Sequence, residues 1–160
     1  MAYKIPPQTK MGHVHLKVAD LDRALGFYNG LLGFEITQRY GTNAVFLSAG
    51  GYHHHIGLNT WYSKDAPPAP VKSAGLFHVA ILFSTRKELA VAFKRLLDAA
   101  YPLTGASDHG VSEAIYLNDP DGNGVELYWD RPKQEWPVDK SGNLLMVTEA
   151  LDLNELLAEI

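Results

Sequence analysis

Three side chains in this sequence form a candidate ligand set for a divalent metal. His13 and His78 each precede a valine in similar surroundings, and Glu126 follows a turn-forming run at residues 119–124. Two neutral imidazoles and one carboxylate suit a divalent first-row metal and leave open positions for other molecules. A strand glutamate usually faces solvent, and a single histidine usually serves structure. The metal interpretation therefore depends on whether the fold brings the three side chains together.

The turn before Glu126 and the strand that carries it can be predicted from residues 118–128. Pro120 presets φ for a tight turn, and the glycines that follow it tolerate positive φ. Side chains alternate along a strand, so Glu126 lies on the face opposite Val125 and Leu127. One face of this strand is expected to pack on the core, while the other presents Glu126.

The two histidines occupy equivalent places in a repeated pattern. Each lies in a predicted first strand, which is followed by a capped amphipathic helix and three further strands. The two halves match at offsets of about 65 to 70 residues, which indicates an internal duplication. The strands are predicted at 11–18, 34–40, 43–48 and 52–59, then at 77–83, 103–107, 111–118 and 124–130, with helices that begin at Asp20 and Thr85.

The repeat predicts one α+β domain over 1–160 with two paired βαβββ modules. Module one spans about 11–62, a proline-rich linker about 63–74 and module two about 75–131, and 132–160 form a C-terminal tail. Each helix is expected to cover the apolar face of its sheet, so that the polar faces line a shared concave space. In the tail, 144–147 predict a short strand, and the helix after Asp152 covers the core or forms a homodimer contact.

Composition excludes several classes of partner. The 160 residues carry a net charge of −4 without a basic stripe, which argues against nucleic acid. Cysteine is absent, so His and carboxylates are the strong metal ligands that remain. We see neither an apolar leader nor a segment long enough to span a bilayer. We therefore expect a cytoplasmic protein that acts on a small diffusing molecule.

Two sequence blocks resemble the vicinal oxygen chelate superfamily. They are GHVHLKVADL at 12–21 and DPDGNGVE at 119–126, and the resemblance covers about residues 11 to 131. This superfamily includes glyoxalase I, bleomycin-resistance proteins, fosfomycin-modifying enzymes and type I extradiol ring-cleavage dioxygenases. The resemblance implies a cupped mixed β-sheet around a metal, with ligands at His13, His78 and Glu126.

Further residues resemble the extradiol dioxygenases in particular. The segment YHHHI at 52–56 is similar to the one that holds their acid–base histidine, which would be His55, with His54 as the nearest substitute. His109 and Tyr116 match a histidine and a tyrosine near their metal. The resemblance implies a catechol-type aromatic substrate, O₂, and Fe(II), with Mn(II) or another divalent metal as the alternative.

Other members of the superfamily remain alternatives. Glyoxalase I uses a second glutamate from the first module, but no Asp or Glu occurs from Ile36 to Lys64. A fosfomycin-type thiol transferase shares the His, His, Glu pattern, and a bleomycin-resistance-like binding protein needs no metal. The best-known extradiol enzymes often carry two module pairs, whereas this chain has one.

Overall fold

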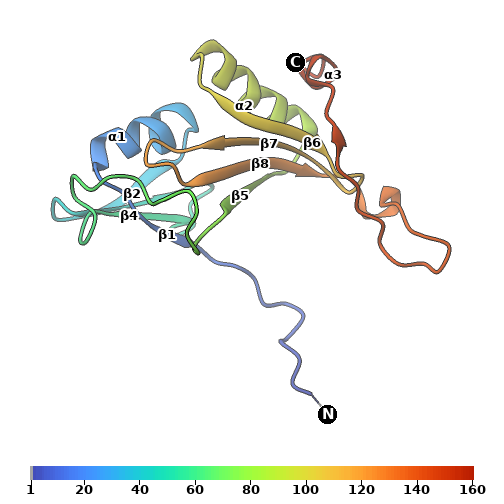
Figure 1. Cartoon of the computed structure of the whole chain (residues 1–160), viewed down its shortest axis with the longest axis horizontal. Coiled ribbons are helices and arrows are strands. Elements are labelled where there is room, and N and C mark those ends of the chain that lie inside the picture. The colour runs from blue at the N-terminus through green and yellow to red at the C-terminus, as the bar shows by residue number, and fades with distance from the viewer. Residues whose placement is uncertain (1) are drawn as a thin grey trace.

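The computed structural model describes residues 2–160 and contains two βαβββ modules (Figure 1). The elements of module one are β1 (Val14–Lys17), α1 (Leu21–Leu25), a π-helical continuation (Gly26–Leu31), β2 (Glu35–Tyr40), β3 (Ala44–Ser48) and β4 (Ile56–Asn59). Those of module two are β5 (His78–Phe83), α2 (Arg86–Asp98), β6 (Leu103–Asp108), β7 (Ser112–Asn118) and β8 (Gly124–Asp130). The tail adds a 3₁₀ turn (Lys133–Glu135), β9 (Glu149–Ala150) and α3 (Leu153–Leu157).

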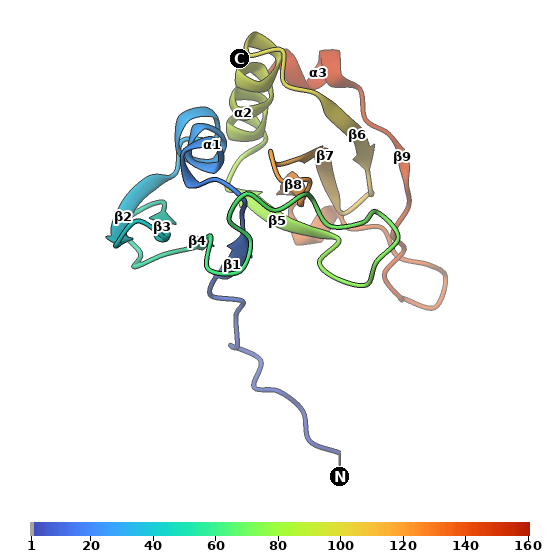
Figure 2. The same cartoon turned by 60° about the vertical axis from the view of Figure 1, so that its left-hand side comes forward.

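Each module forms its own mixed sheet. The strand order is β1-β4-β3-β2 in a four-stranded sheet and β5-β8-β7-β6-β9 in a five-stranded sheet. The first and last strands of each module run parallel, and the other neighbours run antiparallel. Figures 1 and 2 show α1 and α2 near each other on the same side of the two sheets. The predicted α+β class and the repeated element order are confirmed.

Local signals at the helix ends also agree with the structure. Thr85 and Glu88 form a reciprocal capping box at the start of α2, and Asp20 and Asp152 accept backbone N–H groups at the starts of α1 and α3. The predicted first helix is not uniformly α-helical, because its second half is a π-helix in which Leu32 N–H bonds the Phe27 carbonyl.

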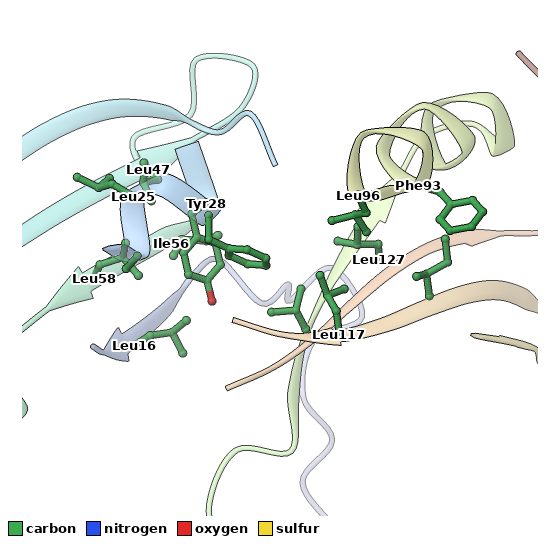
Figure 3. Packing of buried hydrophobic residues seen from close by; sticks show 14 of the residues in the cluster. Leu16, Leu25, Tyr28, Leu47, Ile56, Leu58, Phe93, Leu96, Leu117 and Leu127 are labelled. Carbon is green, nitrogen blue, oxygen red and sulfur yellow. The ribbon is translucent and has the colours of Figure 1, made fainter. Parts of the chain in front are cut away.

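The core is one cluster of buried apolar side chains drawn from both modules, part of which Figure 3 shows. Tyr28 and Leu25 pack over sheet one, while Phe93 and Leu96 pack over sheet two. Leu156 of α3 is also fully buried, so the final helix covers the core. The side chains labelled around them in Figure 3 are Leu16, Leu47, Ile56 and Leu58 in module one, and Leu117 and Leu127 in module two.

Two predicted strands differ from the observed ones. Strand β4 begins at Ile56 rather than near residue 52, although the His55 backbone still bonds to Leu47 and Val14. The stretch 144–147 forms only one isolated bridge, between Val138 and Leu144. The tail instead joins sheet two slightly later, where β9 pairs with β6.

Candidate functional site

Strand register places three predicted site residues on one face of sheet two. Glu126 of β8 lies opposite Ala80 of β5 on one side and opposite Tyr116 of β7 on the other. His78 precedes Ala80 by two residues, so it shares the face that carries Glu126. The Nε2 atom of His78 lies 2.9 Å from Glu126 Oε2, and the Tyr116 hydroxyl donates to Glu126 Oε1 at 3.1 Å.

Gly124 makes room for His78. The two residues lie directly opposite each other in the β5–β8 pair. A Cβ atom on Gly124 would stand 2.1 Å from the Phe77 carbonyl oxygen and 3.1 Å from the His78 Cβ. The turn sequence thus supplies a close backbone approach as well as flexibility.

His109 extends this cluster into a hydrogen-bonded chain. Its Nε2 lies 2.8 Å from the Tyr116 hydroxyl, and its Nδ1 lies 2.9 Å from the Val147 carbonyl oxygen. Burial, and then the adjacent Glu126 carboxylate, raise the pKa of Tyr116 to about 12, so its hydroxyl keeps its proton at neutral pH.

The proton count of this chain follows from the chemistry of its atoms. The Val147 carbonyl can only accept a hydrogen bond, so the Nδ1 atom of His109 must carry a proton. Tyr116 has one proton to share between His109 and Glu126. If Tyr116 donates to Glu126, then His109 Nε2 needs its own proton to donate to the Tyr116 oxygen. If Tyr116 donates to His109 instead, then Glu126 needs a proton to donate to Tyr116. The chain can therefore hold a proton beside the carboxylate.

The donor pair His78 and Glu126 fits a divalent cation in chemistry and direction. An imidazole nitrogen and a carboxylate oxygen converge, and Tyr116 holds the other carboxylate oxygen in place. His13 does not join them: its ring is exposed and stacks on His54 with centroids 4.3 Å apart. Within residues 2–160 no group of three or more His, Asp or Glu side chains is arranged to hold a metal. The three-residue ligand set stays a prediction.

His55 belongs to a group of histidines in module one. Its Nδ1 accepts a long hydrogen bond from the Ala49 N–H at 3.4 Å and lies 3.0 Å from the Ser48 hydroxyl. When His55 is neutral, its proton therefore lies on Nε2. Desolvation, and then neighbouring imidazoles beginning with His13, lower the pKa of His54. The lowered pKa favours a neutral His54 imidazole, the form that can accept a proton or bind a metal.

A cleft of about 1240 Å³ separates the modules and is lined by His13, His55 and His78 together with apolar side chains. Val14 and Ile56 contribute to its wall from module one. Glu126, Tyr116 and His109 do not line it. His78 is therefore the residue that connects the cleft to the hydrogen-bonded chain of module two.

The family model described as the Glyoxalase/Bleomycin resistance protein/Dioxygenase superfamily matches residues 10–127. The chain belongs to this superfamily. It is 39% identical over 156 residues to the catechol-2,3-dioxygenase of Bacillus subtilis (strain 168), covering 97% of this chain and 53% of that protein. It is 30% identical over 122 residues to biphenyl-2,3-diol 1,2-dioxygenase 3 of Rhodococcus globerulus, covering 76% of this chain and 63% of that protein.

A further relative is the manganese-dependent 2,3-dihydroxybiphenyl 1,2-dioxygenase of Geobacillus genomosp. 3. It is 27% identical over 141 residues, covering 84% of this chain and 41% of that protein. The chain thus spans between 41% and 63% of the length of these three curated relatives.

Solved structures show the same fold at low identity. A glyoxalase/dioxygenase from Nostoc punctiforme superposes with a TM-score of 0.64 at 16% identity, covering 82% of this chain and 99% of that one. A lactoylglutathione lyase from Agrobacterium tumefaciens gives 0.60 at 23% identity, covering 78% and 96%. Among the helices of residues 2–160, none combines the length and apolar character that a membrane crossing needs.

The turn before Glu126 also connects the two modules of this superfamily member, which the sequence analysis missed. Asp119 Oδ2 accepts a hydrogen bond from the buried Tyr28 hydroxyl at 2.9 Å. Asp121 Oδ1 accepts from the Ala19 N–H at 2.9 Å and pairs with Arg23. Burial, and then Asp119, raise the pKa of Tyr28. Carboxylates in a turn are usually solvated, so their sequence context gives no signal for these contacts.

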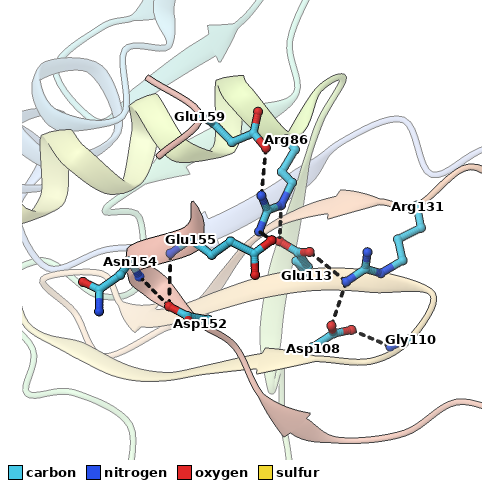
Figure 4. Close-up of polar contacts among 9 residues, drawn as sticks. All are labelled: Arg86, Asp108, Gly110, Glu113, Arg131, Asp152, Asn154, Glu155 and Glu159. Carbon is cyan, nitrogen blue, oxygen red and sulfur yellow. Dashed lines mark hydrogen bonds and ion pairs between the residues drawn. The ribbon is translucent and has the colours of Figure 1, made fainter. Parts of the chain in front are cut away.

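A buried carboxylate behind the site was also missed. Glu113 is 2% exposed and lies between two arginines, with Arg86 Nε and an Arg131 terminal nitrogen each 2.8 Å from its oxygens (Figure 4). A signal for it exists in the sequence. Glu113 shares a strand face with the core residues Ile115 and Leu117. A charged side chain on the buried face of a strand requires a partner of opposite charge.

Proposed function

We propose that this protein is a metal-dependent extradiol dioxygenase that opens a catechol-type aromatic ring with O₂. The observation that carries the proposal is the convergence of His78 and Glu126, with Tyr116 and His109 linked to the same carboxylate. Relatives named as catechol and biphenyl-diol dioxygenases support this chemistry.

The proposed metal ligands are His78, Glu126 and His13. For His13 to take part, the open cleft between the modules must narrow at this point. The proposed metal is Fe(II), with Mn(II) as the alternative that the manganese-dependent relative favours. When bound, such a metal acts as a Lewis acid that lowers the pKa of catechol hydroxyls and orients the substrate.

His55 is the proposed acid–base residue. The Nδ1 atom of His55 accepts a hydrogen bond from the Ala49 N–H, so Nε2 is the ring nitrogen left to exchange a proton with a substrate. Histidine is the side chain best suited to both accept and donate a proton near neutral pH. His55 would accept a proton from a substrate hydroxyl and later return one to the product.

Tyr116 and His109 are proposed to orient the substrate from module two. The phenol keeps its proton because its pKa is raised, so it can donate to an anionic oxygen. His109 lies behind it and holds the hydroxyl through Nε2.

Oxygen uptake tests this proposal. The protein is loaded anaerobically with Fe(II) or, in parallel, Mn(II), and is then given catechol and several substituted catechols. We expect oxygen consumption matched by the yellow ring-opened product, with one metal more active than the other. A protein that retains metal but consumes no oxygen with any catechol is not an extradiol dioxygenase of these substrates, and isomerase and thiol-transfer assays would follow.

A further inference from the structure

The C-terminal tail contacts the hydrogen-bonded chain directly. The Val147 N–H donates to the His109 carbonyl at 3.1 Å, and the Val147 carbonyl lies 2.9 Å from Nδ1 of the same histidine. Two bonds between one pair of residues hold both the backbone and the ring of His109. The residues are 38 positions apart, so only the fold creates this contact.

Gly110 shows how closely the tail packs here. Its φ is +74°, which disfavours any other residue, and a Cβ atom would lie 3.0 Å from Pro137 Cγ and 3.4 Å from Val147 Cγ2. The tail thus covers the backbone next to His109 so closely that an added methyl group would require the Pro137 and Val147 side chains to shift by a few tenths of an ångström.

The tail is anchored on both sides of Val147. Before it, Trp136 Nε1 donates to the Arg131 carbonyl at 2.8 Å. After it, Glu149 of β9 lies opposite Asp108 of β6, and Leu156 of α3 is fully buried. Anchors on both sides lower the entropy that Val147 must lose to hold His109.

The Asp108 side chain, just before His109 in the chain, is held by hydrogen bonds to Gly110 and Arg131 (Figure 4). Asp108 accepts the Gly110 N–H at 2.7 Å and a hydrogen bond from Arg131 at 2.7 Å. Arg131 is in turn bonded to the buried Glu113. His109 is therefore held by the tail on one side, and the residues next to it in the turn are fixed by charge-assisted hydrogen bonds.

The extent of sequence similarity separates the tail from the general fold. The superfamily model ends at residue 127, before the tail begins. The match to the Bacillus subtilis relative covers 97% of this chain and so includes most of the tail. The tail is therefore an addition to the two modules, and the Bacillus subtilis relative has a similar segment.

We propose that the tail is a positioning element of the active site, which keeps the proton of His109 on Nδ1 and turns Nε2 toward Tyr116. Without the Val147 carbonyl, the neutral ring can place its proton on either nitrogen and can rotate away from Tyr116. The role in ring cleavage rests on the proposed function, whereas the effect on His109 does not.

The test is the tautomer of His109, read by NMR of ¹⁵N-labelled imidazoles in the full chain without substrate. The chain has seven histidines, and the His109 signals are those missing from His109→Gln. In the wild type we expect Nδ1 to be protonated at neutral and mildly alkaline pH. In Gly110→Ala, the added methyl group pushes against the Pro137 and Val147 side chains at a strained φ, so we expect the tail to shift and the tautomers to mix.

The matched control is Gly142→Ala. Gly142 lies in the same tail at φ +81°, and a Cβ there has nothing within 4 Å, so this variant carries the same backbone strain without displacing Val147. It should keep the wild-type tautomer. In the loaded enzyme, Gly110→Ala should lower kcat roughly tenfold or more with a smaller change in KM, as expected for a misplaced group.

Three results would overturn the inference: an unprotonated Nδ1 in the wild type, a wild-type tautomer in folded Gly110→Ala, or equal changes in Gly110→Ala and Gly142→Ala. If Gly110→Ala does not fold, Val147→Pro tests the same hold, because proline lacks the N–H that bonds the His109 carbonyl. A tautomer change without any ring-cleavage activity in the wild type would support the tail's role and reject the proposed function.

Discussion

The two modules share one element order but prepare their functional side chains differently. In module two, His78, Glu126, Tyr116 and His109 form one continuous chain of polar contacts that ends on the Val147 carbonyl. In module one, the histidines are mostly exposed and stack on one another, as His13 does on His54.

This difference indicates that the two modules of the duplicated fold have different roles in binding. A connected set of partly buried groups is preorganised and costs little to align when a ligand binds. Exposed rings with few hydrogen bonds adapt more easily, at a larger entropic cost. Module two is therefore expected to define the metal position, and module one to adjust to metal and substrate. Four predictions test this comparison.

The largest effect is expected from Glu126→Ala. This change removes the carboxylate that joins His78 to Tyr116, so metal retention and turnover should both be lost. Metal content after desalting and oxygen uptake are the measurements. Glu35→Ala, at an exposed strand glutamate of module one, is the control and should retain both. Full activity in Glu126→Ala would rule out every metal-enzyme version of the proposal.

The second prediction concerns His55 of module one. His55→Ala should keep the metal but lower kcat by roughly 10²-fold or more, the usual scale for a lost acid–base group. His53→Ala is the matched control, because His53 is exposed and its ring nitrogen contacts His54 rather than the Ser48 loop. If His53→Ala or His54→Ala shows the large loss instead, the acid–base role passes to that histidine.

The third prediction compares glycines on the last strand of each module. Gly124→Ala in β8 would place a methyl against the Phe77 backbone, so it should cost about 1–3 kcal/mol of stability and weaken metal retention. Gly57→Ala in β4 would meet only the exposed His15 ring at 2.9 Å, and a side chain can move. It should cost less than about 1 kcal/mol. Urea unfolding measures both, and equal losses would contradict the difference in rigidity.

The smallest effects are expected where the modules meet. Tyr28→Phe removes a buried hydroxyl that bonds Asp119 and should cost about 1–2 kcal/mol. Arg23→Ala removes a half-exposed partner of Asp121 and should cost less than about 1 kcal/mol. Thermal unfolding of both variants measures the order, and a larger loss for Arg23→Ala would show that the exposed ion pair dominates the junction.

Much of the fold could be predicted from local sequence patterns. Alternation indicated the strands, and the Thr85–Glu88 spacing indicated a capping box, because these signals depend on neighbours within a few residues. The start of β4 and the strand expected at 144–147 were less accurate. Both lie in segments whose pairing depends on distant chain rather than on local preference.

The candidate site was less accessible to the same reasoning. The phase of Glu126 opposite Val125 and Leu127 was predicted correctly, since a strand has a fixed period of two. The contact between Glu126 and His78 follows from strand register, which alternation alone does not determine. The resemblance to a family was needed to single out His55, His109 and Tyr116, whose roles stay predictions.

By itself the sequence determined the two βαβββ modules, the helix starts and the face on which Glu126 lies, because each depends on a local period or cap. Only the tertiary structure decided that Glu113 is enclosed by two arginines, that the turn carboxylates join the modules, and that Val147 holds His109. These contacts connect residues far apart in the chain. Strand alternation indicates that Glu113 is buried, but no short-range pattern identifies the distant partners or the hydrogen-bond geometry that stabilises these contacts.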